Sequence, residues 1–212
     1  ISFIRNTLKS LASGVDYMQA RSGFDSNFTS YDYRAIVGQS LGLIYGYEFD
    51  GIYQYSDFYS VPGSSTLQLK EGVTSNPSLG NRLAPGAVKY KDQDGDGVIT
   101  TNDRTVIGNA LPKWYGGITN TFNYKGFDLS VFLYASFGAM LYNDIYAVEH
   151  CGRNGGVKVD YWTPNNPTNA YPRPSIDEER PIYITSTYYE KADFLRVKTC
   201  LLYTSPSPRD CS

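Results

Sequence analysis

The residues best suited to metal chemistry lie in an acidic segment at residues 92–103, with the sequence DQDGDGVITTND. Asp92, Asp94 and Asp96 stand at positions 1, 3 and 5 of the segment, and Gly97 follows at position 6. Carboxylates at this spacing direct oxygen ligands toward one hard cation, and the glycine permits the sharp turn that such a loop needs. The pattern predicts a calcium loop with ligands from Asp92, Asp94, Asp96, the Val98 carbonyl, Thr100 and Asp103.

Two features separate this segment from the loop of an EF-hand. Position 12 is Asp103, which is shorter than the bidentate Glu of the template. The flanking residues 85–90 and 104–107 have strand-like patterns, not helical ones. A bound calcium would therefore be weakly held and structural in role, and the alternative is a solvated Asp/Gly-rich turn.

Other residues offer little chemistry. His150 is the single histidine, and Cys151, Cys200 and Cys211 have no CxxC spacing, which argues against a zinc site and a disulfide framework. None of the common nucleophile, metalloprotease or phosphate-loop motifs is present. A net charge of -2 without a basic run argues against a nucleic-acid partner. We expect no enzyme activity.

The chain around the acidic segment is organised by a predicted β-hairpin at residues 113–137. Alternation with a period of two places apolar and polar side chains on opposite faces, which indicates strands. The first arm is interrupted only by Asn120. The expected lipid-facing set on the second arm is Phe127, Leu129, Val131, Leu133 and Phe137, and the opposite set includes Asp128, Ser130, Tyr134 and Ser136.

Each arm has the roughly 9–11 residues of a tilted transmembrane strand, which is longer than most strands of soluble sandwiches. The tight turn at Lys125-Gly126 contrasts with long irregular ranges at about 12–34, 56–112 and 138–192. Short turns on one side and long loops on the other are typical of an outer-membrane barrel. We also expect strands near residues 1–11 and 194–197, and a strand with glycine-dependent bends at 35–55.

An ordered set of motifs resembles the C-terminal part of the SusC/RagA family of TonB-dependent outer-membrane transporters. The motifs are VGQSLG at 37–42, YGY at 45–47, FDGI at 49–52, PG at 85–86, KYKD at 89–92, DGDGVI at 94–99, NDR at 102–104, IG at 107–108, PK at 112–113, NTF at 120–122, YKGFDL at 124–129, YWTP at 161–164 and NP at 166–167. They extend over residues 1–198.

The resemblance implies an all-β chain that is a fragment of a large antiparallel transmembrane β-barrel with long extracellular loops. It implies that the whole barrel also contains an N-terminal plug domain, which is not part of this chain. It further implies a Gram-negative outer-membrane location with the acidic loop outside the cell. The implied partners are a SusD-like surface lipoprotein, which acts as a lid, and the TonB complex, which acts through an N-terminal part absent from this chain. The implied substrates are glycans, peptides or other nutrients.

Residues 199–212 depart from the family pattern. The tail from Cys200 to Ser212 interrupts the alternation, adds two prolines and resembles translated sequencing adapter. Our hypothesis is that this tail is not native and that Cys200 and Cys211 have no function. Resequencing of the locus tests the hypothesis, because a reading frame that continues through the tail into genuine coding sequence would contradict it.

Two other classes of protein remain open at this point. One is a secreted, calcium-stabilised β-sandwich that binds carbohydrate, and the other is an accessory domain of a glycoside hydrolase. Solubility separates them from the barrel, because an uncovered apolar strand face needs detergent. For loop aromatics such as Trp162, packing within the loops is the favoured interpretation over stacking on sugar rings.

Overall fold

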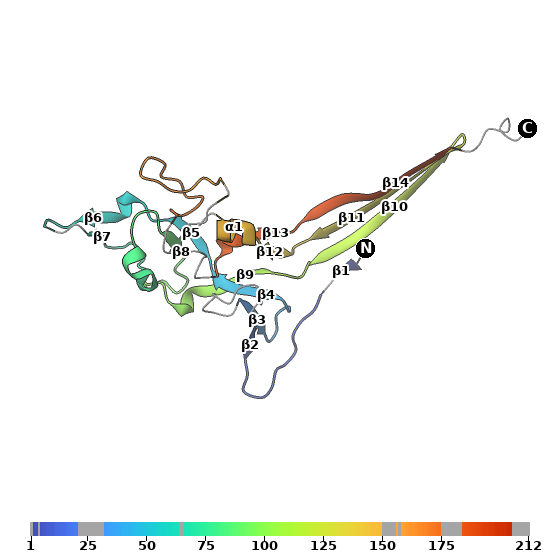
Figure 1. Ribbon diagram of the computed structural model, residues 1–212. Coiled ribbons are helices and arrows are strands. Elements are labelled where there is room, and N and C mark those ends of the chain that lie inside the picture. Colours follow the sequence, from blue (N-terminus) through green and yellow to red (C-terminus); the bar gives the residue numbers. More distant parts are fainter. Residues whose placement is uncertain are drawn as a thin grey trace, which may run out of the picture.

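The computed structural model describes residues 2–3, 5–20, 32–63, 66–149, 156, 158–174 and 184–204. A long, narrow ribbon of strands extends from a broader head of short strands and loops (Figure 1). His150, Cys151 and Cys211, considered above, lie outside the described residues. No helix among the described residues is both long enough and apolar enough to cross a membrane.

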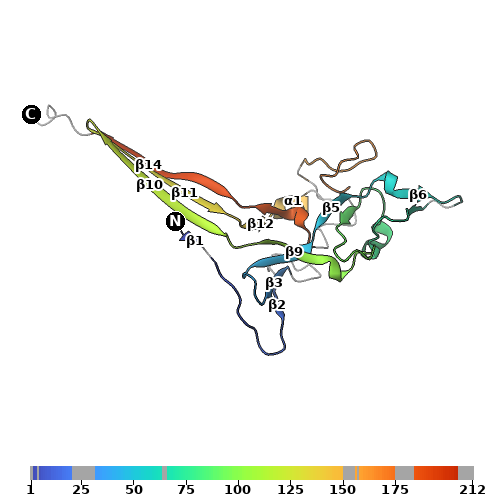
Figure 2. The same cartoon turned by 180° about the vertical axis from the view of Figure 1, so that it is seen from behind.

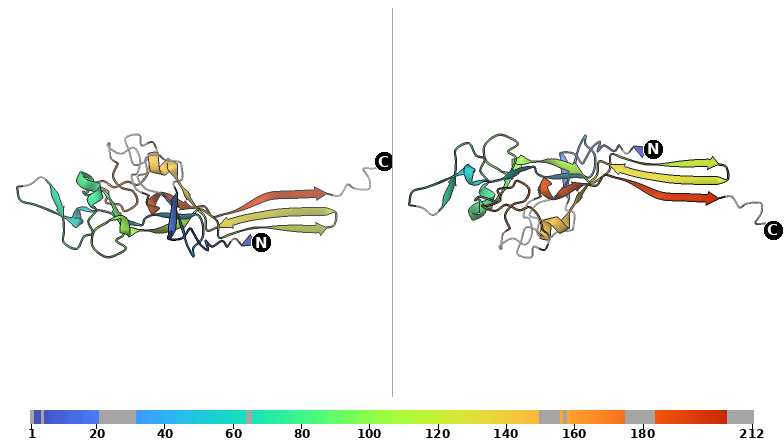
Figure 3. Two further views of the ribbon diagram at one scale, coloured as in Figure 1. Left: turned by 90° about the horizontal axis from the view of Figure 1, so that it is seen from below. Right: turned by 90° about the horizontal axis from the view of Figure 1, so that it is seen from above.

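The ribbon is an antiparallel sheet with the strand order β1-β10-β11-β14. Its strands are β1 (Ser2–Phe3), β10 (Trp114–Tyr124), β11 (Phe127–Phe137) and β14 (Phe194–Thr204). The strands β10, β11 and β14 each contain 11 residues. The predicted hairpin and its length are therefore confirmed, and Figure 3 shows β14 lying beside the two arms of the hairpin, β10 and β11.

The turn between β10 and β11 is as tight as the sequence predicts. Lys125 has a φ of 47° and Gly126 has a φ of 84°, so both central residues adopt left-handed conformations. Two such residues form the type I′ turn, whose twist matches that of the flanking strands. The turn lies at the tip of the ribbon that is farthest from the head (Figure 1).

The register of the hairpin aligns its two apolar stripes. Ile118 pairs with Leu133, and Phe122 pairs with Leu129. Directly paired residues of antiparallel strands project from the same face of the sheet. The ribbon therefore has one apolar face, formed by Ile118, Phe122, Tyr124, Phe127, Leu129, Val131, Leu133, Phe137, Leu195, Val197 and Leu202.

The opposite face of the ribbon is more polar and is crossed by a few aromatic rings. Asn123 Nδ2 donates to Asp128 Oδ1 at 2.6 Å near the turn. Phe132 covers Gly117, where an added Cβ would lie 2.5 Å from the ring. Tyr134 lies 5.8 Å from Phe194, measured between ring centroids. The two faces are thus chemically different, as the alternation predicts.

Strand β14 continues past the boundary that the sequence suggests at residue 198. Leu133 pairs with Val197 and Phe132 pairs with Thr199, so Lys198 is the extra residue of a β-bulge. The bulge restores pairing for residues 199–204, which occupy the second half of β14. Strand pairing does not depend on the origin of the sequence, so the non-native tail stays a hypothesis.

Among the described residues, the head contains one four-stranded sheet and three two-stranded sheets, all antiparallel. The four-stranded sheet consists of β2 (Tyr17–Ala20), β3 (Tyr33–Ile36), β4 (Leu43–Tyr47) and β9 (Arg104–Asn109). The pairs are β5 (Phe49–Ile52) with β8 (Val88–Tyr90), β6 (Phe58–Ser60) with β7 (Leu67–Leu69), and β12 (Met140–Tyr142) with β13 (Tyr189–Lys191). Viewed from behind in Figure 2, these short elements fill the broad end of the molecule.

The helical elements of the head are short. Within the part of the chain that the structure describes, they are α1 (Asp144–Glu149) and four 3₁₀ turns, η1 (Tyr55–Asp57), η2 (Pro77–Arg82), η3 (Thr101–Asp103) and η4 (Ser186–Tyr188). The ranges expected to be loops, at about 12–34, 56–112 and 138–192, thus contain these turns and most of the short strands of the head. The strands and turns provide hydrogen-bond partners for backbone groups that would otherwise be unpaired.

Buried side chains of the head form three small clusters among the residues that the structure describes. Ile44, Ile184 and Tyr189 centre the first, and Tyr53, Phe58, Leu79 and Ala87 form the second. The third consists of Tyr47, Tyr90 and Ile99. The single strand expected at 35–55 is instead divided, because residues 37–42 turn between β3 and β4 and residue 48 separates β4 from β5. A glycine-dependent bend is present at β4, where the register shifts after Ile44 and a Cβ on Gly46 would overlap the Ile184 carbonyl oxygen.

Candidate functional site

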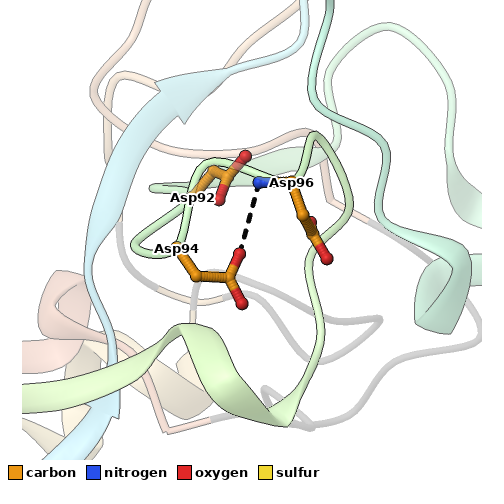
Figure 4. A group of neighbouring side chains, drawn as sticks. All are labelled: Asp92, Asp94 and Asp96. Carbon is orange, nitrogen blue, oxygen red and sulfur yellow. Dashed lines mark hydrogen bonds between the residues drawn. The ribbon is translucent and has the colours of Figure 1, made fainter.

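The acidic segment connects β8 to β9 on the head. Its three alternating aspartates project from one compact loop, shown as sticks in Figure 4. One carboxylate oxygen from each of Asp92, Asp94 and Asp96 lies within 4.8 Å of the others. The structure thus brings together three of the six residues that the sequence predicts as calcium ligands.

Hydrogen bonds to the backbone fix the shape of the loop. Asp92 accepts from the Gly95 N–H at 2.6 Å and, through its other oxygen, from the Gly97 N–H at 2.7 Å. Asp94 accepts from the Asp96 N–H at 3.3 Å, and Asp96 accepts from the Val98 N–H at 2.7 Å. Each carboxylate keeps further lone pairs that a cation can use.

Asp103 has a different position from the other three aspartates. It is fully buried, and its Oδ1 accepts from the Gln93 N–H at 2.8 Å. Its Oδ2 accepts from the Thr100 N–H at 2.7 Å, while Thr100 Oγ1 accepts from the Asn102 N–H at 3.1 Å. Asp103 lies outside the group of three and joins the two ends of the loop, and Thr100 caps η3.

The electrostatics of the loop differ between neighbouring carboxyls. The Gly97 N–H holds the pKa of Asp92 below its ordinary value, and the Gly95 N–H adds to this effect. Partial desolvation raises the pKa of Asp94, and the nearby charges of Asp96, Asp103 and Asp92 raise it further. A bound cation would relieve this mutual repulsion, so the donor set fits a hard divalent ion.

Residues 97–99 of the acidic loop are anchored to the head by backbone hydrogen bonds to Ser75. The Ser75 N–H donates to the Gly97 carbonyl at 2.9 Å, and the Ile99 N–H donates to the Ser75 carbonyl at 2.7 Å. Ile99 is buried against Tyr47 and Tyr90, whose rings stack with centroids 5.0 Å apart. Because these contacts need no ion, the backbone positions the carboxylates in advance.

A second well-packed segment of the head, residues 160–173, lies against β5 and the residues that follow it; we call it the docked segment. Trp162 is buried, and its Nε1 donates to Gln54 Oε1 at 2.7 Å. Gln54 Nε2 in turn donates to the Ile52 carbonyl at 3.0 Å, and the Arg173 N–H donates to the Gly86 carbonyl at 2.9 Å. Trp162 therefore packs within the head, as the sequence analysis favours.

The sequence analysis gave no role to Gln54, which holds the indole, or to Gly86, whose added Cβ would meet the Trp162 ring at 2.5 Å. The pattern YWTPNNP signals the docked segment itself, but neither of its partners is predictable from local sequence.

Comparison with solved structures identifies the architecture. The chain superposes on a chain of the RagAB peptide importer, solved in its open-open state, with a TM-score of 0.57 and 17% sequence identity. The match covers 95% of this chain and 19% of the importer chain. The chain therefore has the fold of a segment of a large antiparallel β-barrel, as predicted.

Comparison with curated proteins identifies the family. TonB-dependent receptor P3 of Formosa agariphila is 33% identical over 165 residues, which are 76% of this chain and 15% of the receptor. TonB-dependent receptor P26 of the same organism is 30% identical over 198 residues, which are 91% of this chain and 18% of the receptor. The chain belongs to the TonB-dependent receptors.

A third receptor of the same organism, P39, is 29% identical over 213 aligned positions that cover 87% of this chain. The chain spans 15% to 20% of the length of these three curated relatives. No family model matches the chain. The secreted sandwich and the hydrolase accessory domain are not favoured, because the relatives are named as receptors and the structural neighbour is part of an importer.

Proposed function

We propose that this chain is part of an outer-membrane, TonB-dependent importer of the SusC/RagA type. The observation that carries the proposal is the two-faced ribbon, whose apolar face is exposed at Ile118, Phe122, Leu195 and Leu202. Strands of 11 residues with one apolar and one polar face have the length and pattern of outer-membrane strands. In this proposal lipid contacts the apolar face, and the polar face lines the lumen or contacts a plug.

The opposite ends of the ribbon support an orientation for the proposed importer. The two-residue turn lies at one end and the loop-rich head lies at the other (Figure 1). Outer-membrane barrels have short periplasmic turns and long extracellular loops. We therefore place the head, with its acidic loop, outside the cell.

The proposed partners follow from the same assignment. A SusD-like surface lipoprotein closes over the head as a lid, and the inner-membrane TonB complex supplies energy through a part of the receptor outside this chain. The cargo is an oligosaccharide, a peptide or another nutrient, and the structural neighbour is named as a peptide importer. The chain binds and guides its cargo and does not act as an enzyme.

Uptake by living cells tests the proposed function. A strain that lacks the receptor gene should lose growth on, or uptake of, one class of oligosaccharide or peptide. Restoring the gene should recover uptake in cells with a functional TonB system, but not in cells without one. Uptake that is unchanged by deletion across a panel of both nutrient classes, or that continues without TonB, would contradict the proposal.

We also propose that calcium occupies the acidic loop in a structural role, held by Asp92, Asp94 and Asp96. Hydrogen–deuterium exchange of residues 92–103 in the purified receptor tests this proposal with calcium and with EGTA. Calcium should slow exchange in the wild type and have less effect in the Asp94→Asn/Asp96→Asn variant. The control is an Asp50→Asn variant, which removes an exposed carboxylate of β5 outside the acidic loop. Equal exchange with and without calcium in the wild type would contradict the proposal.

A further inference from the structure

A cleft of about 710 Å³ lies where the ribbon joins the head. It is bordered by the end of β9, by Lys113 and Gly138 at the base of the hairpin, and by the strands β12 and β13. A smaller cavity of about 280 Å³ adjoins it, because Ser40, Asn109 and Lys113 line both. The acidic loop contributes no residue to either cavity, so this is a separate site.

The base of the hairpin forms one edge of the cleft. The Lys113 N–H donates to the Phe137 carbonyl at 3.0 Å, beside the last regular pair of the hairpin, Trp114 with Phe137. A Cβ on Gly138 would lie 2.9 Å from Lys113 Cγ, so the Lys113 side chain lies directly beside Gly138 at this edge.

The cleft presents hydrogen-bond donors that have no partner among the described residues. Lys113, Lys191 and the Gln39 carboxamide line it, and none of the three makes a side-chain hydrogen bond or ion pair within the described part of the chain. Asp193 also lines the cleft, and its Oδ1 already accepts from the Gly138 N–H at 2.6 Å. Arg5 adds a third cation in the adjoining cavity. The cationic groups therefore exceed the anionic ones, which favours an acidic ligand.

The floor of the cleft narrows the ligand class further. Leu43, Ile107, Ala139 and Met140 supply an apolar surface between the charged groups. No aromatic side chain is among the described residues that line the cleft, so it offers no platform on which a sugar ring can stack. Aliphatic floors with charged rims suit polypeptide segments that carry both apolar and charged side chains.

We propose that this cleft binds an extended acidic peptide segment through Lys113 and Lys191. The inference rests on the proposed import function and names the ligand chemistry that this site accepts. The ligand carboxylates contact the two ammonium groups, and its apolar side chains lie on Leu43, Ile107 and Met140. An acidic peptide segment of this kind can come from two sources: an imported peptide or the receptor's own plug.

Binding of a defined probe to the complete receptor in detergent tests this proposal. The probe is a fluorescein-labelled, C-terminally amidated peptide Ala-Glu-Leu-Glu-Ala-Leu, and its comparison replaces both Glu residues with Gln. The Lys113→Gln/Lys191→Gln variant should bind the acidic probe about 3- to 10-fold more weakly, the range expected for two exposed charge pairs. Added salt should weaken wild-type binding through screening. Lys70→Gln, an exposed lysine elsewhere on the head, is the matched control and should bind as the wild type does.

The possible results distinguish a failure of the cleft proposal from a failure of the proposed import function. Equal affinity of the wild type and the double variant for the acidic probe, with and without the plug, would overturn the proposal. So would equal affinity of the wild type for the Glu and Gln peptides. Lysine-dependent binding that emerges only after deletion of the plug supports the acidic-peptide chemistry and assigns the plug as its source. Loss of TonB-dependent uptake concerns the proposed function alone, because the binding measurement needs neither TonB nor transport.

Discussion

At the scale of single residues, close approaches in the head depend on two glycines in paired strands. An added Cβ on Gly46 would overlap the Ile184 carbonyl oxygen, whereas one on Gly108 would overlap the Met140 sulfur. A backbone carbonyl held by the Tyr47 N–H at 2.8 Å cannot move away easily, but a methionine side chain can. Gly108 should therefore tolerate substitution by alanine better than Gly46 does.

We expect Gly46→Ala to destabilise the first core cluster by about 1–3 kcal/mol, the usual range for overpacking. Gly108→Ala should cost less, because Met140 can adopt another rotamer. Hydrogen–deuterium exchange of residues 44–47 and 184–189 in the purified receptor measures the local opening free energy. A larger effect of Gly108→Ala would contradict this assignment of rigid and flexible neighbours.

Asp160 gives the docked segment a dependence on pH. Asn166 Nδ2 and Thr168 Oγ1 each donate to its carboxylate at 2.8 Å, and these bonds lower the pKa of Asp160 below its ordinary value of 3.8. A lowered pKa stabilises the folded segment above about pH 4, and this stabilisation is lost as the pH falls through the folded-state pKa. We therefore expect the docked segment to loosen as the pH falls below about 4.

The indole of Trp162 reports this loosening, since Trp114 is the only other tryptophan of the chain and can be replaced by Phe. In that background, emission from Trp162 should shift to longer wavelength in acid. Asp160→Ala should show a similar shift already at pH 6, whereas Asp50→Asn should behave as the wild type does. Emission that is independent of pH in the wild type would show that Asp160 does not hold the segment.

At the scale of elements, the face assignment of β11 gives a paired prediction. Val131 pairs with Asn120 and Cys200 on the apolar face, and Ser130 pairs with Thr121 and Leu201 on the polar face. Arginine on a lipid-facing site costs about 2–4 kcal/mol at the bilayer midplane. We expect Val131→Arg to reduce barrel assembly and Ser130→Arg to be much less disruptive. The amount of heat-modifiable receptor in outer membranes measures assembly, and an equal loss in both variants would reject the assignment.

At the scale of the whole molecule, the ribbon determines how the isolated chain behaves in solution. Its apolar face exposes large side chains, and pairing leaves β1 and β14 as the outer strands of the described sheet. Exposed apolar surface and unpaired strand edges both promote association. We expect the isolated chain to need detergent to stay dispersed, as measured by light scattering. A monodisperse monomer in plain buffer would contradict lipid contact by this face.

Much of the ribbon is predictable because its signals are local. Alternation from Phe127 to Phe137, the length of the arms and the Lys125-Gly126 turn each depend on residues near one another in sequence. The short strands of the head are less predictable, since strand pairs such as Leu43 with Asn109 join residues far apart in the sequence. Each of these short strands also contains too few residues to show a clear alternation of apolar and polar side chains.

The sequence by itself determined the strand period, the tight turn and the clustering of Asp92, Asp94 and Asp96, because each follows from spacing along the chain. Only the tertiary structure decided that Asp103 turns inward to join the loop ends and that Trp162 is held by Gln54. It also decided that Lys113 and Lys191 border one cleft. The physical reason is that burial and side-chain partners depend on long-range packing, which local spacing does not specify.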